Sequence, residues 1–213
     1  MKSPETILND LICTYPTLCP LEEKLFQAYE LLVQCYDRGG MVLCCGNGGS
    51  AADAEHIVGE LMKSFLLPRP LRGEKAQRFF ETETGRALAE ELQEPLPAVS
   101  LVSQSALLSA YANDVSTDMI YAQQVLGYAS HRPVLLISMS TSGNSLNVVR
   151  AVQVASTLGM PSVAITGESG GRLKEEATVC LNMPASETYQ VQELTLPVYH
   201  ALCAMVEAHY FAV

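Results

Sequence analysis

The sequence predicts an α/β protein in which a doubly wound, mainly parallel β-sheet is flanked by helices. Two observations lead to this fold class. Short apolar runs alternate along the chain with helical stretches of roughly 10 to 16 residues, and strands joined by such connections do not pair as hairpins. Two of these runs also pass directly into Gly- or Ser-rich loops that precede helices, an order typical of parallel βαβ units. Ligands of such sheets bind beyond the carboxyl ends of the strands, where both loops would lie.

The first half of the chain contains one strand–loop–helix unit. A helix is predicted over 21–36, because apolar residues recur there with a period near 3.6 and Gly39-Gly40 ends the pattern. The continuous apolar run 41–45 predicts a buried strand. It is followed by the glycine-rich loop 46–50 and by a predicted helix over 51–65.

The second half repeats this order, with a strand over 133–139, a hydroxyl-rich loop over 140–145 and a helix over 146–158. Shorter apolar runs predict the remaining strands, and a long, largely apolar stretch predicts a C-terminal helix. These elements are strands at 98–102, 162–166 and 178–182, and a helix from about 187 to 211.

One segment, 68–97, differs from its surroundings because it is rich in charged residues and bounded by prolines. Residues 74–93 within it are compatible with a single helix. We interpret the segment as an insertion, which is either a solvated excursion or a lid or oligomer contact.

Composition limits the classes of function. The chain has 213 residues, of which 48% are hydrophobic, so we expect one domain over 1–213. Its apolar runs are too short to cross a bilayer and no secretory signal pattern opens the chain, so we expect a cytoplasmic protein without membrane contact. The net charge of −10 opposes nucleic-acid binding. The seven cysteines form neither a CxxC pair nor a disulfide framework, which indicates that most are buried, reduced thiols.

The two loops are candidate binding sites. The loop 46–50 could bind an anion or a sugar hydroxyl, or could serve only for tight packing. It matches neither nucleotide-binding glycine pattern, so no nucleotide cofactor is expected. The loop 140–145 carries four hydroxyl side chains before a helix. These are either ordinary caps and turn residues or donors that hold a phosphate monoester without Lys or Arg.

Ionisable side chains on two predicted helices could act beside these loops. His56 and Glu60 are four residues apart and therefore share a helix face. On the C-terminal helix, His200 is either a core histidine or, together with Gln192, a residue that faces a cavity. The other two histidines, His131 and His209, have no such neighbours, and we expect them at the surface.

Together these residues resemble a known family. The segments 45–56, 113–114, 140–145 and 192–200 occur in the order and spacing of the phosphoheptose isomerases, which are sugar isomerase (SIS) domain proteins. The resemblance covers about 21–206. It implies a SIS-type, flavodoxin-like three-layer sandwich that converts sedoheptulose 7-phosphate to D-glycero-D-manno-heptose 7-phosphate, the first step towards the heptose of bacterial surface glycans.

The resemblance also implies roles for individual residues. It places Glu60 and His200 at the acid/base positions and implies a homotetramer with sites between subunits. In some members of the family a zinc ion is bound by residues that match His56, Glu60, Gln192 and His200, so zinc or another divalent metal is an expected cofactor. The substrate contacts implied are Asn47, Gly48, Gly49, Ser50, Asn113, Asp114, Ser140, Thr141, Ser142, Ser145 and Gln192.

A second interpretation remains open. A sister branch with the same fold is not catalytic and docks a replication initiator protein. That branch lacks the glutamate and the C-terminal histidine, so Glu60 and His200 favour the isomerase. The insertion 68–97 is much longer than the connection usual in phosphoheptose isomerases, and it leaves the identity of the sugar open.

Overall fold

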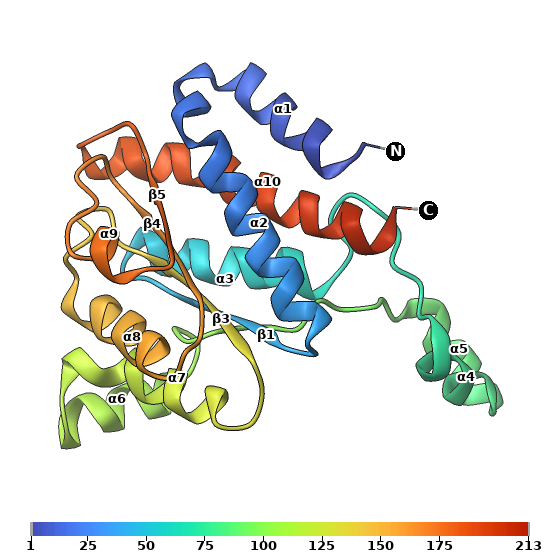
Figure 1. Ribbon diagram of the computed structural model, residues 1–213. Helices are drawn as coiled ribbons and strands as arrows, with labels where there is room; N and C mark the ends of the chain where they lie inside the picture. Colours follow the sequence, from blue (N-terminus) through green and yellow to red (C-terminus); the bar gives the residue numbers. More distant parts are fainter. Residues whose placement is uncertain (1, 213) are drawn as a thin grey trace.

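The computed structural model describes residues 2–212 and confirms the predicted fold class. Within this range the strands form one parallel sheet in the order β2-β1-β3-β4-β5. Helices cover both of its faces, so the molecule has three layers (Figure 1). The strands are β1 (Met41–Cys45), β2 (Ala98–Ser100), β3 (Val134–Met139), β4 (Ser162–Thr166) and β5 (Val179–Asn182).

The helices divide between the two faces of the sheet. The first face is covered by α2 and α3, with α10 packed against both and α1 packed on α10, whereas α7, α8 and α9 contact the sheet from the other side. The helices and helical turns are α1 (Pro4–Thr14), η1 (Pro16–Leu21), α2 (Glu22–Asp37), α3 (Gly49–Met62), α4 (Gly73–Phe80), α5 (Glu83–Glu91), α6 (Ser105–Asp114), η2 (Thr117–Met119), α7 (Ile120–Ala129), α8 (Leu146–Thr157), α9 (Leu173–Glu176) and α10 (Thr188–Phe211).

Strand β1 shows why the sheet is buried on both sides. Its side chains alternate between the two cores: Val42 and Cys44 pack with α2, α3 and α10, and Met41, Leu43 and Cys45 pack on the opposite face. All five are buried. The sequence of a strand that is covered on both faces is therefore a continuous apolar run, not an alternation of apolar and polar residues.

Most predicted elements are confirmed with small shifts at their ends. The strands predicted at 41–45 and 162–166 match β1 and β4, and the C-terminal helix predicted from about 187 to 211 matches α10. Helix α3 begins two residues earlier than predicted and ends at Met62, because Lys63 takes an extended conformation. No helix within residues 2–212 combines the length and the apolar character needed to cross a membrane.

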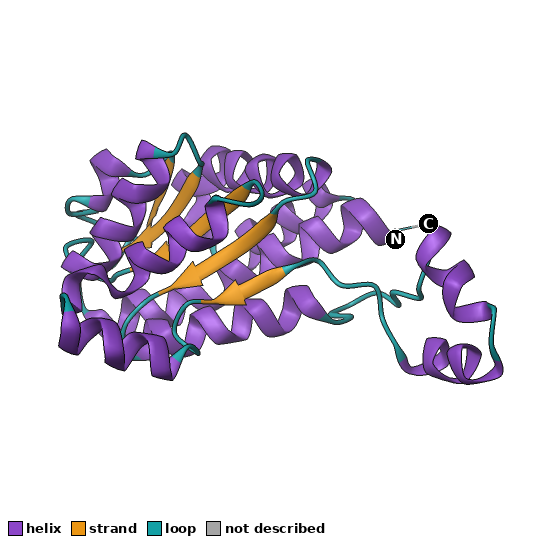
Figure 2. Cartoon of the chain, turned by 90° about the horizontal axis from the view of Figure 1, so that it is seen from below, coloured by secondary structure: helices purple, strands orange, loops and turns teal. Residues whose placement is uncertain are grey.

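The insertion forms an arm rather than one helix. Helices α4 and α5 contact each other and project away from the body of the molecule (Figures 1 and 2). The prediction of a single helix over 74–93 is wrong. Thr82 interrupts it with an extended conformation, and its hydroxyl accepts a hydrogen bond from the Gly85 N–H, which caps α5.

Helices α1, α6, α7 and the short α9 were not among the predicted elements. Helix α6 buries none of its residues in this chain, and its apolar residues do not keep to one narrow stripe. Periodicity therefore gives little signal for it.

Cysteine usage agrees with the prediction. Every cysteine is a free thiol, and only Cys13 and Cys19 are exposed. Burial raises the pKa of Cys35 to about 11 and that of Cys45 to about 12. Such thiols stay protonated near neutral pH and behave as small apolar side chains.

Candidate active site

The candidate site lies where the order of the sheet reverses. Strands β1 and β3 are neighbours at the centre of the sheet, and β2 lies on the other side of β1. The loops that follow β1 and β3 meet at this switch point, which is where doubly wound sheets bind ligands. Asn47 in the first loop and Asn147 at the start of α8 exchange two amide hydrogen bonds of 2.9 and 3.0 Å. The Tyr121 hydroxyl donates to the Gly46 carbonyl oxygen at 2.8 Å and holds the same loop from the side of α7.

The first loop needs its glycines for two different reasons. Gly48 has φ +59° and ψ −123°, a conformation that side chains disfavour. Gly49 leaves room for the side chain of Gln192, because a Cβ at position 49 would lie 2.5 Å from Nε2 of Gln192. The amide of Gln192 therefore lies against the start of α3. Ser50 is buried behind it, and its N–H donates to the Asn47 carbonyl oxygen.

The hydroxyl-rich loop is partly bonded within itself. The Ser140 hydroxyl donates to that of Ser145 at 3.0 Å, and the Ser142 hydroxyl accepts the Asn144 N–H at 3.2 Å. Thr141 lies on the side of α10, with its hydroxyl 3.5 Å from that of Thr188. The loop leads directly into α8 at Leu146. These hydroxyls therefore shape the turn and stand at a helix N-terminus, a position that favours anions.

Helices α3 and α10 bring three ionisable side chains together. The Nε2 atom of His56 lies 3.2 Å from Oε1 of Glu60 and 3.4 Å from Nε2 of His200. The other carboxylate oxygen of Glu60 accepts a hydrogen bond from Lys63 Nζ at 3.0 Å. The Glu60 side chain is 12% exposed and that of His56 is 43% exposed. The cluster is thus half-open, with a carboxylate and two imidazoles in contact range.

Burial and packing lower the pKa of His200. Its ring packs against Phe65, with the ring centroids 5.4 Å apart, and against His56 at 4.9 Å. Burial lowers the pKa of His200 and the neighbouring His56 lowers it further, whereas the carboxylate of Glu60 acts in the opposite direction. The neutral form is favoured.

A tyrosine links the two helices behind this cluster. The Tyr199 hydroxyl lies 2.9 Å from Nδ1 of His56 and 3.3 Å from Oδ1 of Asp53. Burial raises the pKa of Asp53, and the hydrogen bond from Tyr199 opposes that shift. Burial also raises the pKa of Tyr199, and the nearby Asp53 charge raises it further.

A buried ion pair fixes the end of α3 to α10. Arg69 Nε lies 2.7 Å from Oε1 of Glu207, and both side chains are fully buried. The same guanidinium donates to the carbonyl oxygens of Leu61 and Glu60 at the end of α3. The Glu207 carboxylate also accepts three backbone N–H groups, those of residues 65–67. This Arg69–Glu207 clamp thus holds the helix end that carries Glu60 and the backbone N–H of Phe65.

Two expected site residues, Asn113 and Asp114, make no hydrogen bond to the rest of the candidate site within residues 2–212. Asn113 and Asp114 end α6, and the amide of Asn113 donates to the Asp114 carboxylate at 2.8 Å. Among residues 2–212, no hydrogen bond joins either side chain to the two loops or to Glu60. His131 and His209 are exposed, as predicted.

The expected metal donors are only partly assembled. His56, Glu60 and His200 are close together, whereas Gln192 lies at Gly49. As the side chains lie, no group of three or more His, Cys, Asp or Glu within residues 2–212 is arranged to hold a metal ion. Two imidazoles and a carboxylate are nevertheless donors that suit zinc and similar divalent ions.

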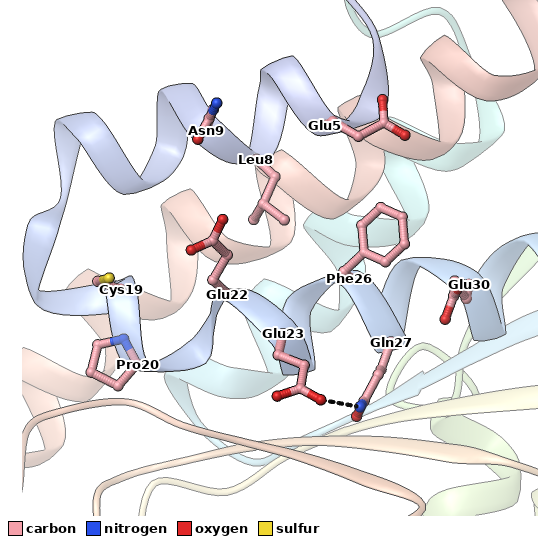
Figure 3. Close-up of a pocket in the computed structure, with 10 residues that line it drawn as sticks. All are labelled: Glu5, Leu8, Asn9, Cys19, Pro20, Glu22, Glu23, Phe26, Gln27 and Glu30. Atoms are coloured by element: carbon pink, nitrogen blue, oxygen red, sulfur yellow. Dashed lines mark hydrogen bonds between the residues drawn. The ribbon is translucent and has the colours of Figure 1, made fainter.

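A separate groove is lined by none of the candidate site residues. It has a volume of about 760 Å³ and is formed by α1, η1 and α2 (Figure 3). Four carboxylates line it, those of Glu5, Glu22, Glu23 and Glu30. Such a surface repels a phosphorylated ligand, so this groove is not a candidate for the anion site.

Several residues that shape the site were not among those predicted from the sequence. Tyr199 gave no signal beyond its position next to His200, and Asn147 gave none beyond following the hydroxyl-rich loop. Lys63 lies three residues after Glu60, a helical spacing that could have indicated the contact. Arg69 and Glu207 are far apart in sequence, and no local pattern could pair them.

Comparison with known proteins identifies the family. Two sequence models, both described as SIS domain, match residues 18–76 and 98–208. They leave most of the arm unmatched. The phosphoheptose isomerase of Shewanella sp. (strain ANA-3) is 35% identical over 194 residues, which cover 90% of this chain and 86% of that protein.

The solved structures that resemble this chain include phosphoheptose isomerases as well. The phosphoheptose isomerase of Neisseria gonorrhoeae is 34% identical with a TM-score of 0.67, and the match covers 86% of each chain. The enzyme of Francisella tularensis is 30% identical with a TM-score of 0.69, over 86% of this chain and 85% of that one. With relatives of this identity along nearly its whole length, the chain belongs to the phosphoheptose isomerase family of SIS domain proteins.

Proposed function

We propose that this protein is an aldose–ketose isomerase that converts D-sedoheptulose 7-phosphate to D-glycero-D-manno-heptose 7-phosphate. The observation that carries the proposal is the meeting of Glu60 and His200 around His56, on two helices that border the loops at the switch point. Relatives over 30% identical are phosphoheptose isomerases, which supports a sugar-phosphate isomerase role.

The reaction needs two kinds of proton transfer. Moving the carbonyl from C2 to C1 requires a base that removes a proton from C1 and returns one to C2, through an enediolate. Glu60 is assigned this role. A second group must move a proton between the two oxygens, and His200 is assigned to it because its imidazole is favoured in the neutral form, which can both accept and donate.

The hydroxyl-rich loop is assigned to the phosphate. Hydroxyls and the N–H groups that begin α8 donate hydrogen bonds to an anion, and the helix dipole adds to the attraction. This local site compensates for a net charge of −10 on the protein. Binding energy from the phosphate, at the far end of the sugar, then holds C1 and C2 beside Glu60 and His200.

We also propose a divalent metal ion, zinc being the first candidate. His56, Glu60 and His200 would hold it, with Gln192 as a fourth donor if its amide leaves Gly49. Such an ion would supply a positive charge near the sugar oxygens. Glu60 cannot serve fully as ligand and base at once, because a bound cation lowers the basicity of a carboxylate. Elemental analysis of protein purified without chelator should find about one divalent ion per chain, and His56→Ala should lose it. Full activity with no metal detected after exhaustive chelation would contradict this.

The function is tested with a panel of substrates. Purified protein is mixed with ketose phosphates of five, six and seven carbons, and the formation of aldose phosphate is followed by NMR. We expect turnover of the seven-carbon substrate above the others. If only a shorter ketose phosphate is turned over, the protein is an isomerase of that shorter sugar phosphate. Binding of all these sugars without turnover would favour the non-catalytic docking module.

A further inference from the structure

Tyr199 connects two residues whose protonation it can determine. Its side chain is buried on α10 and reaches across to α3, where its hydroxyl contacts Nδ1 of His56 and Oδ1 of Asp53. The rings of His56 and Tyr199 are held edge to face, with centroids 5.5 Å apart at 74°. The orientation of the His56 ring is therefore restricted on its Nδ1 side.

The number of available protons fixes the direction of these hydrogen bonds. A phenol has one proton, and an ionised carboxylate has none. Tyr199 therefore donates to Asp53, at 3.3 Å, and must accept at the second contact. The only donor there is an N–H on Nδ1 of His56, 2.9 Å away. In neutral His56 the other ring nitrogen, Nε2, then carries a lone pair.

We propose that Asp53 and Tyr199 are positioning residues that hold His56 in the tautomer protonated on Nδ1. The bare Nε2 atom then faces Oε1 of Glu60 at 3.2 Å and Nε2 of His200 at 3.4 Å. Two acceptors, Nε2 of His56 and the Glu60 carboxylate, are thus turned towards one another. This inference rests on the proposed function for the roles of Glu60 and His200.

This tautomer has a consequence for what the site takes up. Two facing acceptors repel each other unless a proton or a cation lies between them. In the other tautomer, Nε2–H of His56 would donate to Glu60 and close the site. Asp53 and Tyr199 prevent that closure and keep the electron pairs of His56 and Glu60 available. An outer group that orients a histidine in this way typically changes metal affinity by about 10- to 100-fold.

Two variants change the tautomer by different routes. Tyr199→Phe removes the acceptor for Nδ1–H, so the proton should move to Nε2 and donate to Glu60. Asp53→Leu removes the acceptor for the phenol, so the hydroxyl of Tyr199 is free to donate to Nδ1, which again leaves the proton on Nε2. Both variants should therefore give the same tautomer, although one of them keeps the hydroxyl.

The chain offers a matched control near the C-terminal end of α10. The Tyr29 hydroxyl lies 2.8 Å from Nδ1 of His209, a second tyrosine–histidine hydrogen bond between packed helices. Tyr29→Phe removes an equivalent bond and leaves the cluster around His56 untouched. It therefore reports what the loss of such a bond does to the fold alone.

The readout is the ¹⁵N NMR spectrum of the histidine rings, in chelated protein at a pH where the histidines are neutral. His56 is assigned by its loss in His56→Gln. Wild type and Tyr29→Phe should show His56 protonated on Nδ1, and Tyr199→Phe and Asp53→Leu should show it on Nε2. In a parallel titration with Zn²⁺ against a chromophoric chelator, both latter variants should bind about 10- to 100-fold more weakly than Tyr29→Phe.

The result that overturns the proposal is a wild-type His56 protonated on Nε2, or a tautomer and zinc affinity unchanged in Tyr199→Phe. If the wild-type protein binds no Zn²⁺, the His56 tautomers observed by NMR decide alone whether the proposal holds. None of these readouts uses a sugar. Failure of the proposed function, seen as no turnover of any ketose phosphate, is therefore distinguishable from failure of this assignment.

Discussion

At the scale of single residues, the site consists of short contacts around Glu60. One carboxylate oxygen accepts from Lys63 and the other faces His56. Replacing Glu60 by Gln keeps the shape of the side chain but removes the base. We expect Glu60→Gln to lower kcat by roughly 10²- to 10⁴-fold with the circular dichroism spectrum unchanged. His200→Asn should act similarly, because it removes the group that moves a proton between the oxygens. Near-wild-type turnover in both variants would contradict the assignment of this pair.

The hydroxyl-rich loop allows a second test with single residues. Ser142→Asp places a carboxylate beside the N-terminus of α8, where the phosphate is assigned, and like charges repel. We expect loss of sugar-phosphate binding by calorimetry, whereas Ser142→Ala should weaken binding by about tenfold or less. A wild-type protein that binds the phosphorylated and the unphosphorylated sugar equally well would show that the loop is only a structural turn.

The sequence alone could predict the site only in part. His56 and Glu60 share a helix face because of their spacing, and this contact is present. His200 reaches them through the packing of α10 on α3, which no local pattern specifies. Gln192 and His200 are eight residues apart, about 12 Å along a helix. The structure accordingly finds Gln192 at Gly49 and His200 beside His56.

At the scale of elements, the Arg69–Glu207 clamp joins α3, α10 and the base of the arm. Arg69→Met leaves the Glu207 carboxylate buried without its cation, although three backbone N–H groups still donate to it. We expect this variant to lose about 3–5 kcal/mol of unfolding free energy, measured by denaturant titration. The exposed pair of Lys2 and Asp10 is the control, because Lys2→Met should cost less than about 1 kcal/mol. Equal losses in the two variants would contradict a structural role for the clamp.

The sequence indicated the position and length of the arm, but not that it consists of two helices. Helices α4 and α5 pack mainly on each other, and the bridge between Pro70 and Gln93 closes their base. We expect that replacing 73–91 by a short Gly-Ser linker leaves the melting temperature within a few degrees of wild type, because little of the core is lost. Unfolding of this variant at room temperature would show that the arm supports the body.

At the scale of the whole molecule, the alternation of apolar runs and helices was enough to predict the parallel sheet. Parallel strands that are buried on both faces appear in the sequence as continuous apolar runs. The first and last residues of β1 and β4 were therefore predicted correctly. Helix α6 was missed because none of its residues is fully buried in the single chain, although Leu108 packs partly against the core. Its position therefore depends on interactions that a local pattern does not contain.

The exposed side of α6 and α7 leads to a prediction about assembly. Leu107 and Leu126 are each more than 40% exposed there, and Val115 is 63% exposed. Closed symmetric assemblies commonly cover such surfaces. We expect light scattering at micromolar concentration to give the mass of four chains of 23.1 kDa. A monomer mass would refute the homotetramer.

The central claim is that Glu60 takes a carbon-bound proton from a sugar phosphate. It is tested most directly by incubating sedoheptulose 7-phosphate with the protein in D₂O and following the reaction by ¹H and ¹³C NMR. We expect the wild-type protein to form the aldose phosphate with deuterium at C2, and Glu60→Gln to give neither product nor exchange. Unchanged substrate with no deuterium incorporation by the wild-type protein would contradict it.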